Sequence, residues 1–212
     1  MILLLLGDSG FGRLQLQGIL AAMAGGLLTR QAVVVAGERT EELEPDAKEG
    51  EVLLVAEPAE EYLARSLLDL APSCRVVPPP IGPHLFARCL AGRSGGRLDA
   101  APLDLRLPFL RSRGDVTYLS AAAWTCPPDC MAEGPCPAIG LPRTWHLPSL
   151  LRAAARAEGV QAVVFRPRGP ASGAEGVSAA RLQAAMRRVQ RGGRFLVATA
   201  APCHAAASLL VV

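Results

Sequence analysis

The sequence predicts an α/β fold built around a mostly parallel sheet. Short runs of Val, Leu and Ile alternate with stretches of Ala, Leu and Arg that repeat with a helical period, which is the pattern of βαβ units. The apolar runs are almost unbroken, as is typical of strands covered on both faces. Half of the 212 residues are hydrophobic and 19% are charged, so the composition is that of a globular protein with a sizeable core.

The individual elements follow from these runs and from the residues at their ends. Gly25–Gly26 and Gly192–Gly193 suit the left-handed end of a helix, Ser178 suits an N-cap, and Pro58 and Pro148 suit a first turn. Strands are expected, in chain order, at 2–6, 32–36, 52–56, 75–77, 116–120, 162–165 and 195–199. Helices are expected at 12–24, 58–70, 83–91, 148–157 and 178–191.

The apolar segments at both ends are interpreted as core. The run FLVATAAPCHAAASLLVV (195–212) approaches the length of a membrane span, but Pro202 and His204 interrupt it, so it predicts a buried strand followed by a core helix. The opening MILLLL has no basic region before its short apolar run and predicts a strand rather than a signal sequence. We therefore expect a cytoplasmic protein with no membrane partner.

A segment without periodicity separates two halves of the chain. Residues 91–115 are rich in Gly, Pro and Arg, which is typical of a linker. The expected organisation is one half at 1–92, a linker at 93–115 and a βαβ half with a cysteine-rich loop at 116–212, with one continuous domain as the alternative.

The charge pattern argues against a nucleic-acid partner. The net charge is +3, and the basic residues form no long run interleaved with aromatic residues. The chain contains two Trp, two Tyr and five Phe, which is little material for base stacking. A small-molecule or nucleotide ligand is the expected partner.

The first predicted strand leads into a glycine turn, LLLLGDSGFGRLQLQGIL. Gly7, Ser9 and Gly12 occupy the three positions of a G-x-G-x-x-G turn, and Gly10 adds flexibility. Backbone N–H groups in such a turn approach a pyrophosphate at the positive end of the following helix. Glu38, after the second predicted strand, is placed to accept a hydrogen bond from a ribose hydroxyl.

This stretch resembles the Rossmann-type dinucleotide-binding domain, in particular the form found in regulators of bacterial potassium uptake. The resemblance covers about residues 1–90, and its motif lies in the first forty. It implies a Rossmann-like N-terminal half and an NAD(P) ligand held by the turn residues and Glu38. Ser9 stands where the family has its middle glycine, and Asp8 brings a negative charge beside the phosphate position.

The second half carries the segment TCPPDCMAEGPCP, which holds half of the six cysteines. Cys126, Cys130 and Cys136 have the spacing C-x3-C-x5-C, among prolines that stiffen and turn the backbone. Three thiolates this close repel one another unless a cation or cluster offsets their charge. The spacing is neither that of a zinc ribbon nor that of a ferredoxin, so it predicts a site for zinc or an iron–sulfur cluster without choosing between them. Buried thiols or a redox disulfide pair are the alternatives.

The fourth ligand is expected from the segment VATAAPCHAAAS. The loops that follow strands of a parallel sheet leave at one edge, so Cys203 and His204 should meet the three-cysteine loop. His146 and His84 are further candidates, whereas Cys74 and Cys89 are expected in the core. The combination of the N-terminal half, the cysteine loop and the later PCH resembles a group of uncharacterised proteins from anaerobic, metal-respiring bacteria, and this resemblance implies no established activity.

Basic and aromatic residues are expected near the same edge. Arg166 and Arg168 follow a predicted strand and suit a phosphate, a carboxylate or a thiolate cluster; two solvated arginines are the alternative. Trp124 and Trp145 flank the cysteine loop and are expected to form an apolar wall beside it.

Three functional hypotheses follow. In the first, the protein binds a metal or iron–sulfur cluster, and a cluster exchanging electrons with NAD(P) would make it an oxidoreductase. In the second, it is a nucleotide-sensing binding module with a purely structural zinc ion. In the third, it is a scaffold with neither ligand.

Overall fold

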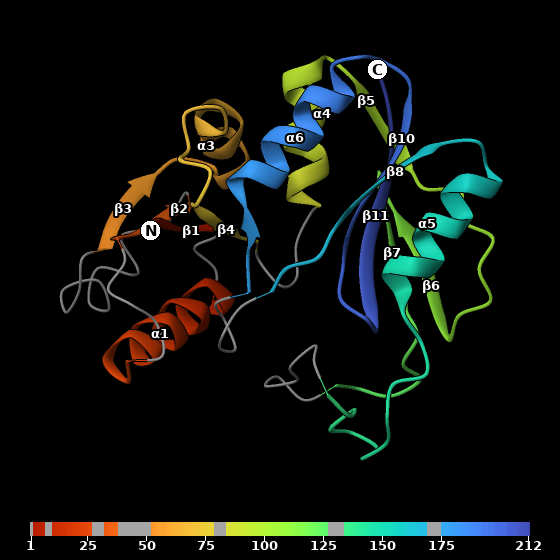
Figure 1. The fold of residues 1–212 in the computed structure, drawn as a ribbon, viewed down its shortest axis with the longest axis horizontal. Coiled ribbons are helices and arrows are strands. Elements are labelled where there is room, and N and C mark those ends of the chain that lie inside the picture. The colour runs from red at the N-terminus through yellow and green to blue at the C-terminus, as the bar shows by residue number, and fades with distance from the viewer. Residues whose placement is uncertain are drawn as a thin grey trace. The chain divides into compact units, whose positions relative to one another are not determined.

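A computed structural model describes residues 2–6, 10–26, 32–37, 52–78, 84–126, 134–168 and 175–212. The chain forms two compact units, each with its own sheet (Figure 1). The first unit comprises residues 1–85 and 168–184, and the second comprises 86–167 and 185–212. The chain therefore passes from one unit to the other three times.

The first unit contains a five-stranded sheet in the order β3-β2-β1-β4-β9. The first four strands run parallel, and β9 pairs antiparallel with β4, where Val177 lies opposite Val76. The strands are β1 (Ile2–Leu6), β2 (Ala32–Gly37), β3 (Val52–Ala56), β4 (Arg75–Val77) and β9 (Val177–Ser178).

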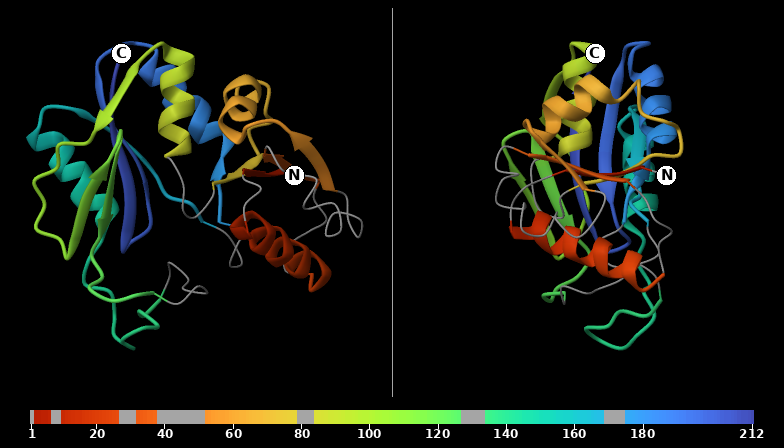
Figure 2. Two further views of the ribbon diagram at one scale, coloured as in Figure 1. Left: turned by 180° about the vertical axis from the view of Figure 1, so that it is seen from behind. Right: turned by 90° about the vertical axis from the view of Figure 1, so that its left-hand side faces the viewer.

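Helices cover both faces of this first sheet. Figure 2 shows α1 (Gly10–Ala24) and α3 (Ala59–Ser66) on opposite sides of the strands. Leu16 and Ile19 of α1 are buried and pack with Val77 of β4. This apolar contact holds α1 against the sheet.

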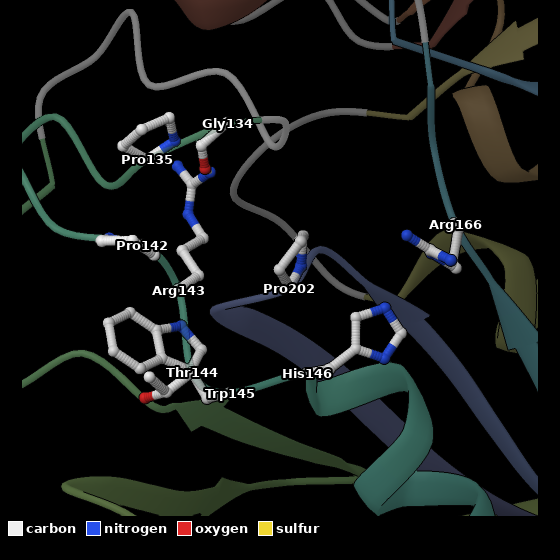
Figure 3. Close-up of a pocket in the computed structure, with 9 residues that line it drawn as sticks. All are labelled: Gly134, Pro135, Pro142, Arg143, Thr144, Trp145, His146, Arg166 and Pro202. Atoms are coloured by element: carbon white, nitrogen blue, oxygen red, sulfur yellow. The ribbon is translucent and has the colours of Figure 1, made fainter.

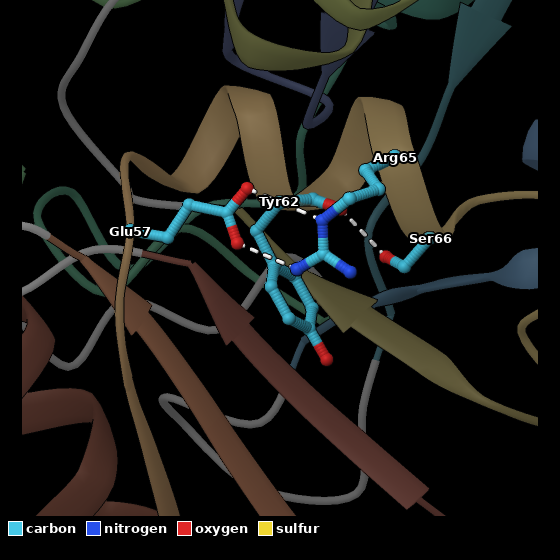
Figure 4. A network of polar contacts seen from close by, with 4 residues as sticks. All are labelled: Glu57, Tyr62, Arg65 and Ser66. Atoms are coloured by element: carbon cyan, nitrogen blue, oxygen red, sulfur yellow. Dashed lines mark hydrogen bonds and ion pairs between the residues drawn. The ribbon is translucent and has the colours of Figure 1, made fainter.

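A surface ion pair joins the last turn of α3 to the residue that follows β3 (Figure 4). The Arg65 guanidinium donates to both carboxylate oxygens of Glu57, at 2.6 Å from Nη2 and 3.4 Å from Nε. The same guanidinium lies 5.2 Å from the centre of the Tyr62 ring. Because the pair is exposed, its contribution to stability is small.

The second unit contains a six-stranded sheet with β11 at its centre. The order is β6-β7-β11-β10-β8, and β5 also pairs with β11. β11 is antiparallel to β10 along its length, while its other edge pairs first with β7 and then with β5. The strands are β5 (Arg97–Ala100), β6 (Phe109–Arg113), β7 (Val116–Ser120), β8 (Gln161–Phe165), β10 (Arg194–Ala200) and β11 (His204–Val211).

Helix α5 (Leu147–Ala157) packs on one face of the second sheet. Its fully buried Leu147 and Leu151 contact small residues of the central strands, including Ala198 and Ala207. On the other face, Phe86 of α4 (Leu85–Ser94) meets Phe165 edge to face at 5.1 Å. Helix α6 (Ala179–Val189) begins in the first unit and ends in the second.

The predicted mostly parallel sheet is wrong. Of the nine pairings between described strands, five are antiparallel, and in the second sheet β8 and β10 form the one parallel pair that is described. The physical reason is β11, which turns back directly from β10 and is antiparallel to each of its neighbours. The second half is therefore not a simple βαβ arrangement.

The positions of the predicted elements are largely confirmed. Each of the seven predicted strands and five predicted helices overlaps an element of the structure. The predicted helix after Pro202 is wrong, since those residues form β11. The predicted linker, 93–115, contains β5 and β6 in the second unit, and the units divide near Leu85 instead.

In the part of the chain that the structure describes, no helix has both the length and the apolar character needed to cross a membrane.

Candidate functional site

Three loops meet at one edge of the second sheet. Strands β7 and β10 run in the same direction because both are antiparallel to β11, and β8 is parallel to β10. The residues that follow these three strands therefore leave at the same edge. They include Cys126 after β7, Arg166 after β8, and Pro202 and Cys203 in the turn that leads to His204, the first residue of β11.

Cys126 and His204, 78 residues apart in sequence, lie side by side. The Cys126 Sγ atom is 3.7 Å from Nε2 of His204. A sulfur and a nitrogen bound to one tetrahedral zinc ion are about 3.6 Å apart, given bonds of about 2.3 and 2.0–2.1 Å. His204 is exposed overall, but partial desolvation lowers its pKa below the ordinary value, which favours the neutral imidazole that binds metals.

The turn that presents His204 is held by backbone hydrogen bonds. The His204 carbonyl accepts from the Ala201 N–H at 2.9 Å, which closes the β10–β11 hairpin. The Cys203 carbonyl accepts from the Ala121 N–H at 2.8 Å, and this bond ties the hairpin to the loop after β7. The Leu147 N–H donates to the Pro202 carbonyl at 2.9 Å and ties the hairpin to α5.

Cys203 is buried and its sulfur accepts a hydrogen bond. The indole Nε1 of Trp145 donates to Sγ of Cys203 at 2.9 Å. The bond gives the indole N–H an acceptor away from water. The rings of Trp145 and Trp124 contact edge to face at 5.7 Å, and Nε1 of Trp124 is buried without a hydrogen-bond acceptor among the described residues.

Cys136 and Cys130 are the other two predicted ligands from the three-cysteine loop. Cys136 is buried in a turn where its N–H donates to the Leu141 carbonyl and its own carbonyl accepts from the Gly140 N–H. Cys130 lies outside the described residues. Among the residues that the structure describes, no three His, Cys, Asp or Glu side chains gather closely enough to hold a metal ion. The structure thus brings two of the five predicted ligands into contact.

The other candidate residues have different contacts. His146 precedes α5, where its Nδ1 lies 2.8 Å from Oγ of Ser149. His84 is buried in the first unit. Arg168 also belongs to the first unit, where its carbonyl accepts from the Arg75 guanidinium. Cys74 and Cys89 are buried, as expected for core residues.

The predicted nucleotide turn is described in part. Gly10 and Gly12 lie in the first turn of α1. Gly7, Ser9 and Glu38 lie outside the described residues, so nucleotide binding stays a prediction.

An open pocket of about 510 Å³ lies at the same edge of the second sheet (Figure 3). Arg143, Trp145 and His146 line it from the segment before α5, and Arg166 and Pro202 line it from the other two loops. The Arg143 guanidinium donates to the Gly134 carbonyl. Arg166 was expected at this edge and Arg143 was not, because the sequence marks Arg143 only by its place in PRTWH, directly before a helix start.

Comparisons with known proteins give one match. Residues 96–212 match the model of the AF_1314_C family, described as "Uncharacterized protein, C-terminal domain". The matched range includes Cys126, His204 and the whole pocket lining. Neither the curated proteins nor the solved structures gave a match. Since the family model covers more than half of the residues, this chain belongs to the AF_1314_C family.

Proposed function

We propose that this protein binds a single thiophilic metal ion, namely zinc, through Cys126 and His204. The 3.7 Å distance between the Cys126 sulfur and the His204 nitrogen carries the proposal. Two loops distant in sequence bring a soft thiolate and an imidazole to the separation that one tetrahedral ion requires. Two of the three cysteines at 130, 136 and 203 supply the remaining two ligands in this proposal.

The state of the two side chains supports the same conclusion. Neutral imidazole is the form that coordinates a metal, and partial desolvation of the exposed His204 lowers its pKa and so favours that form. Cys126 is half-buried, so an ion can reach it without opening the core. The contact of one thiol with one imidazole favours a mixed Cys/His set, typical of zinc, over an all-thiolate cluster.

Metal binding is proposed to take place in the cytoplasm, where thiols stay reduced. No disulfide joins the cysteines that the structure describes. Clustered thiols in a reducing compartment are more typical of metal sites than of disulfides.

A redox role with NAD(P) depends on the glycine turn and stays a prediction. Zinc does not change its oxidation state, so a redox role would require an iron–sulfur cluster in its place, and the nature of the metal decides between a redox protein and a binding module. The experiment below separates these two roles.

The test is anaerobic purification followed by metal analysis and an absorption spectrum. We expect about one equivalent of zinc per chain and no visible band, with metal affinity at least about tenfold lower in Cys126→Ser and in His204→Gln. Cys89→Ala is the control, since it removes a buried thiol from a different element. Stoichiometric iron together with a visible absorption band would instead identify the bound group as an iron–sulfur cluster.

Two results would overturn the proposal. One is wild-type protein that binds no stoichiometric metal when reloaded with zinc. The other is unchanged affinity in both ligand variants while circular dichroism shows that they are folded.

A further inference from the structure

We infer that the pocket before α5 binds a small organic anion, one that carries a carboxylate or phosphate group. The pocket belongs wholly to the second unit and measures about 510 Å³. This volume is within the range of small-molecule sites and exceeds what a bare inorganic ion needs. The inference does not rest on metal binding.

The charge of the lining selects an anion. Arg143 and Arg166 bring two guanidinium groups, His146 adds an imidazole, and none of the residues that line the pocket is Asp or Glu. All three basic side chains are partly buried, which strengthens their interaction with a charged ligand relative to bulk water. Guanidinium groups bind carboxylate and phosphate through paired hydrogen bonds.

The basic groups lie on two sides of the pocket (Figure 3). Arg166 and His146 lie on one side of Pro202, while Arg143 lies on the other side and donates to the Gly134 carbonyl. The His146 ring is held by its contact with Ser149. We therefore assign the anionic group to the side of Arg166 and His146.

The organic part of the ligand has its own surface. Trp145 and the prolines at 135, 142 and 202 give the pocket an apolar lining beside the charged groups. The N-terminus of the eleven-residue helix α5 opens at the same place and adds partial positive charge. A molecule with one anionic end and an apolar or polyhydroxyl body fits a pocket that has charged groups on one side and an apolar lining beside them.

Trp145 makes the inference testable by fluorescence. It lines the pocket, and the other tryptophan, Trp124, contacts its ring, so a ligand that enters should change the intrinsic emission. The probes are glycerol 3-phosphate and glutarate, with glycerol as the uncharged control. We expect a saturable change with at least one anion and none with glycerol.

The variants identify the binding group. Arg166→Gln should raise the Kd about tenfold or more, and Arg166→Lys should raise it less because the charge remains. Arg156→Gln is the matched control, an exposed arginine in the last turn of α5 outside the lining, and its Kd should be unchanged. Circular dichroism establishes that each variant is folded.

The outcomes are distinct from those of the metal experiment. Binding of the phosphate, the carboxylate or both supports the inference and identifies the anionic group. No saturable change with either anion, equal binding of glycerol, or the same Kd in folded Arg166→Gln as in Arg156→Gln overturns it.

Discussion

The Trp145 side chain takes part in a hydrogen bond, a ring contact and the lining of the pocket. Its N–H donates to the Cys203 sulfur, its ring packs edge to face with that of Trp124, and it lines the pocket. An indole nitrogen only donates, so it needs an acceptor when it leaves water. Trp124 has no such acceptor among the described residues, and the two residues therefore form a natural comparison.

The first prediction concerns these two tryptophans. Trp145→Phe should lower the free energy of unfolding by about 1 kcal/mol more than Trp124→Phe, because it removes a made hydrogen bond rather than an unmade one. Each variant replaces one indole of the same edge-to-face pair by a phenyl ring, so the change in the ring contact largely cancels when the two variants are compared. Urea unfolding measures the difference, and equal losses would contradict the assigned hydrogen bond.

The second prediction concerns the buried thiol of Cys89. Burial raises its pKa from 9.0 to about 12. Above pH 9 the unfolded chain releases this proton while the folded chain keeps it, so stability present below pH 9 is lost as the pH rises toward 12. The expected loss is about 1.4 kcal/mol per pH unit.

The measurement is the free energy of unfolding of wild type and Cys89→Ala between pH 8 and pH 11. The variant is less stable near neutrality but should decline less steeply. If the free energy of unfolding fell with pH equally steeply in both proteins, the Cys89 thiol would have the same pKa in the folded and unfolded chain, and the prediction would be wrong.

At the scale of the elements, close packing between β5 and β11 depends on a glycine. A Cβ at Gly96 would lie 2.7 Å from Cδ1 of Leu210 and 2.8 Å from the Val211 carbonyl oxygen. The carbonyl belongs to the backbone at the end of β11 and cannot rotate away.

The third prediction compares two glycines near the end of α4. Gly96→Ala should destabilise the protein by about 1–3 kcal/mol through this overlap. Gly92→Ala lies in the helix with open space around its Cβ and should stabilise it by up to about 1 kcal/mol. Thermal unfolding gives both values, and the absence of opposite signs would contradict the packing described.

The sequence predicted elements where one local pattern decided the structure. The unbroken apolar runs of β1, β2 and β3 allowed no other interpretation. β11 was missed because HAAASLLV has the alanine content of a helix, whereas pairing on both edges makes it a strand. All five residues of β6 are exposed, so no alternation marked it as a strand.

The candidate site was predicted in part for a related reason. Cys126 and His204 were expected to meet because loops after strands of one direction share an edge, and that holds for β7 and β10 even though the sheet is mixed. No local pattern indicated that the Trp145 N–H would point at Cys203, since that contact depends on the turn between β10 and β11.

At the scale of the whole molecule, each unit is assembled from separated segments. Residues 168–184 return to the first unit, where β9 extends the sheet at β4. Gln183 strengthens this return, because its Nε2 donates to the carbonyls of Leu67 and Leu70 at 3.0 and 2.9 Å.

The fourth prediction tests whether the Gln183 hydrogen bonds hold residues 168–184 in the first unit. Gln183→Ala should lower stability by about 1–2 kcal/mol, because two carbonyls lose their donor. Gln190→Ala, an exposed glutamine after α6, is the control and should change it little. Hydrogen exchange should become faster around residues 59–78 in Gln183→Ala, and unchanged exchange there would contradict the role given to Gln183.

The position of β11 also has a consequence for synthesis of the chain. It lies between β10 on one side and β7 and β5 on the other, yet it follows all of them in sequence. A ribosome therefore releases the outer strands of this sheet before the strand that joins them exists. Until residues 204–211 emerge, the edges of β7 and β10 stay unpaired, and chaperone demand should be greatest in that interval.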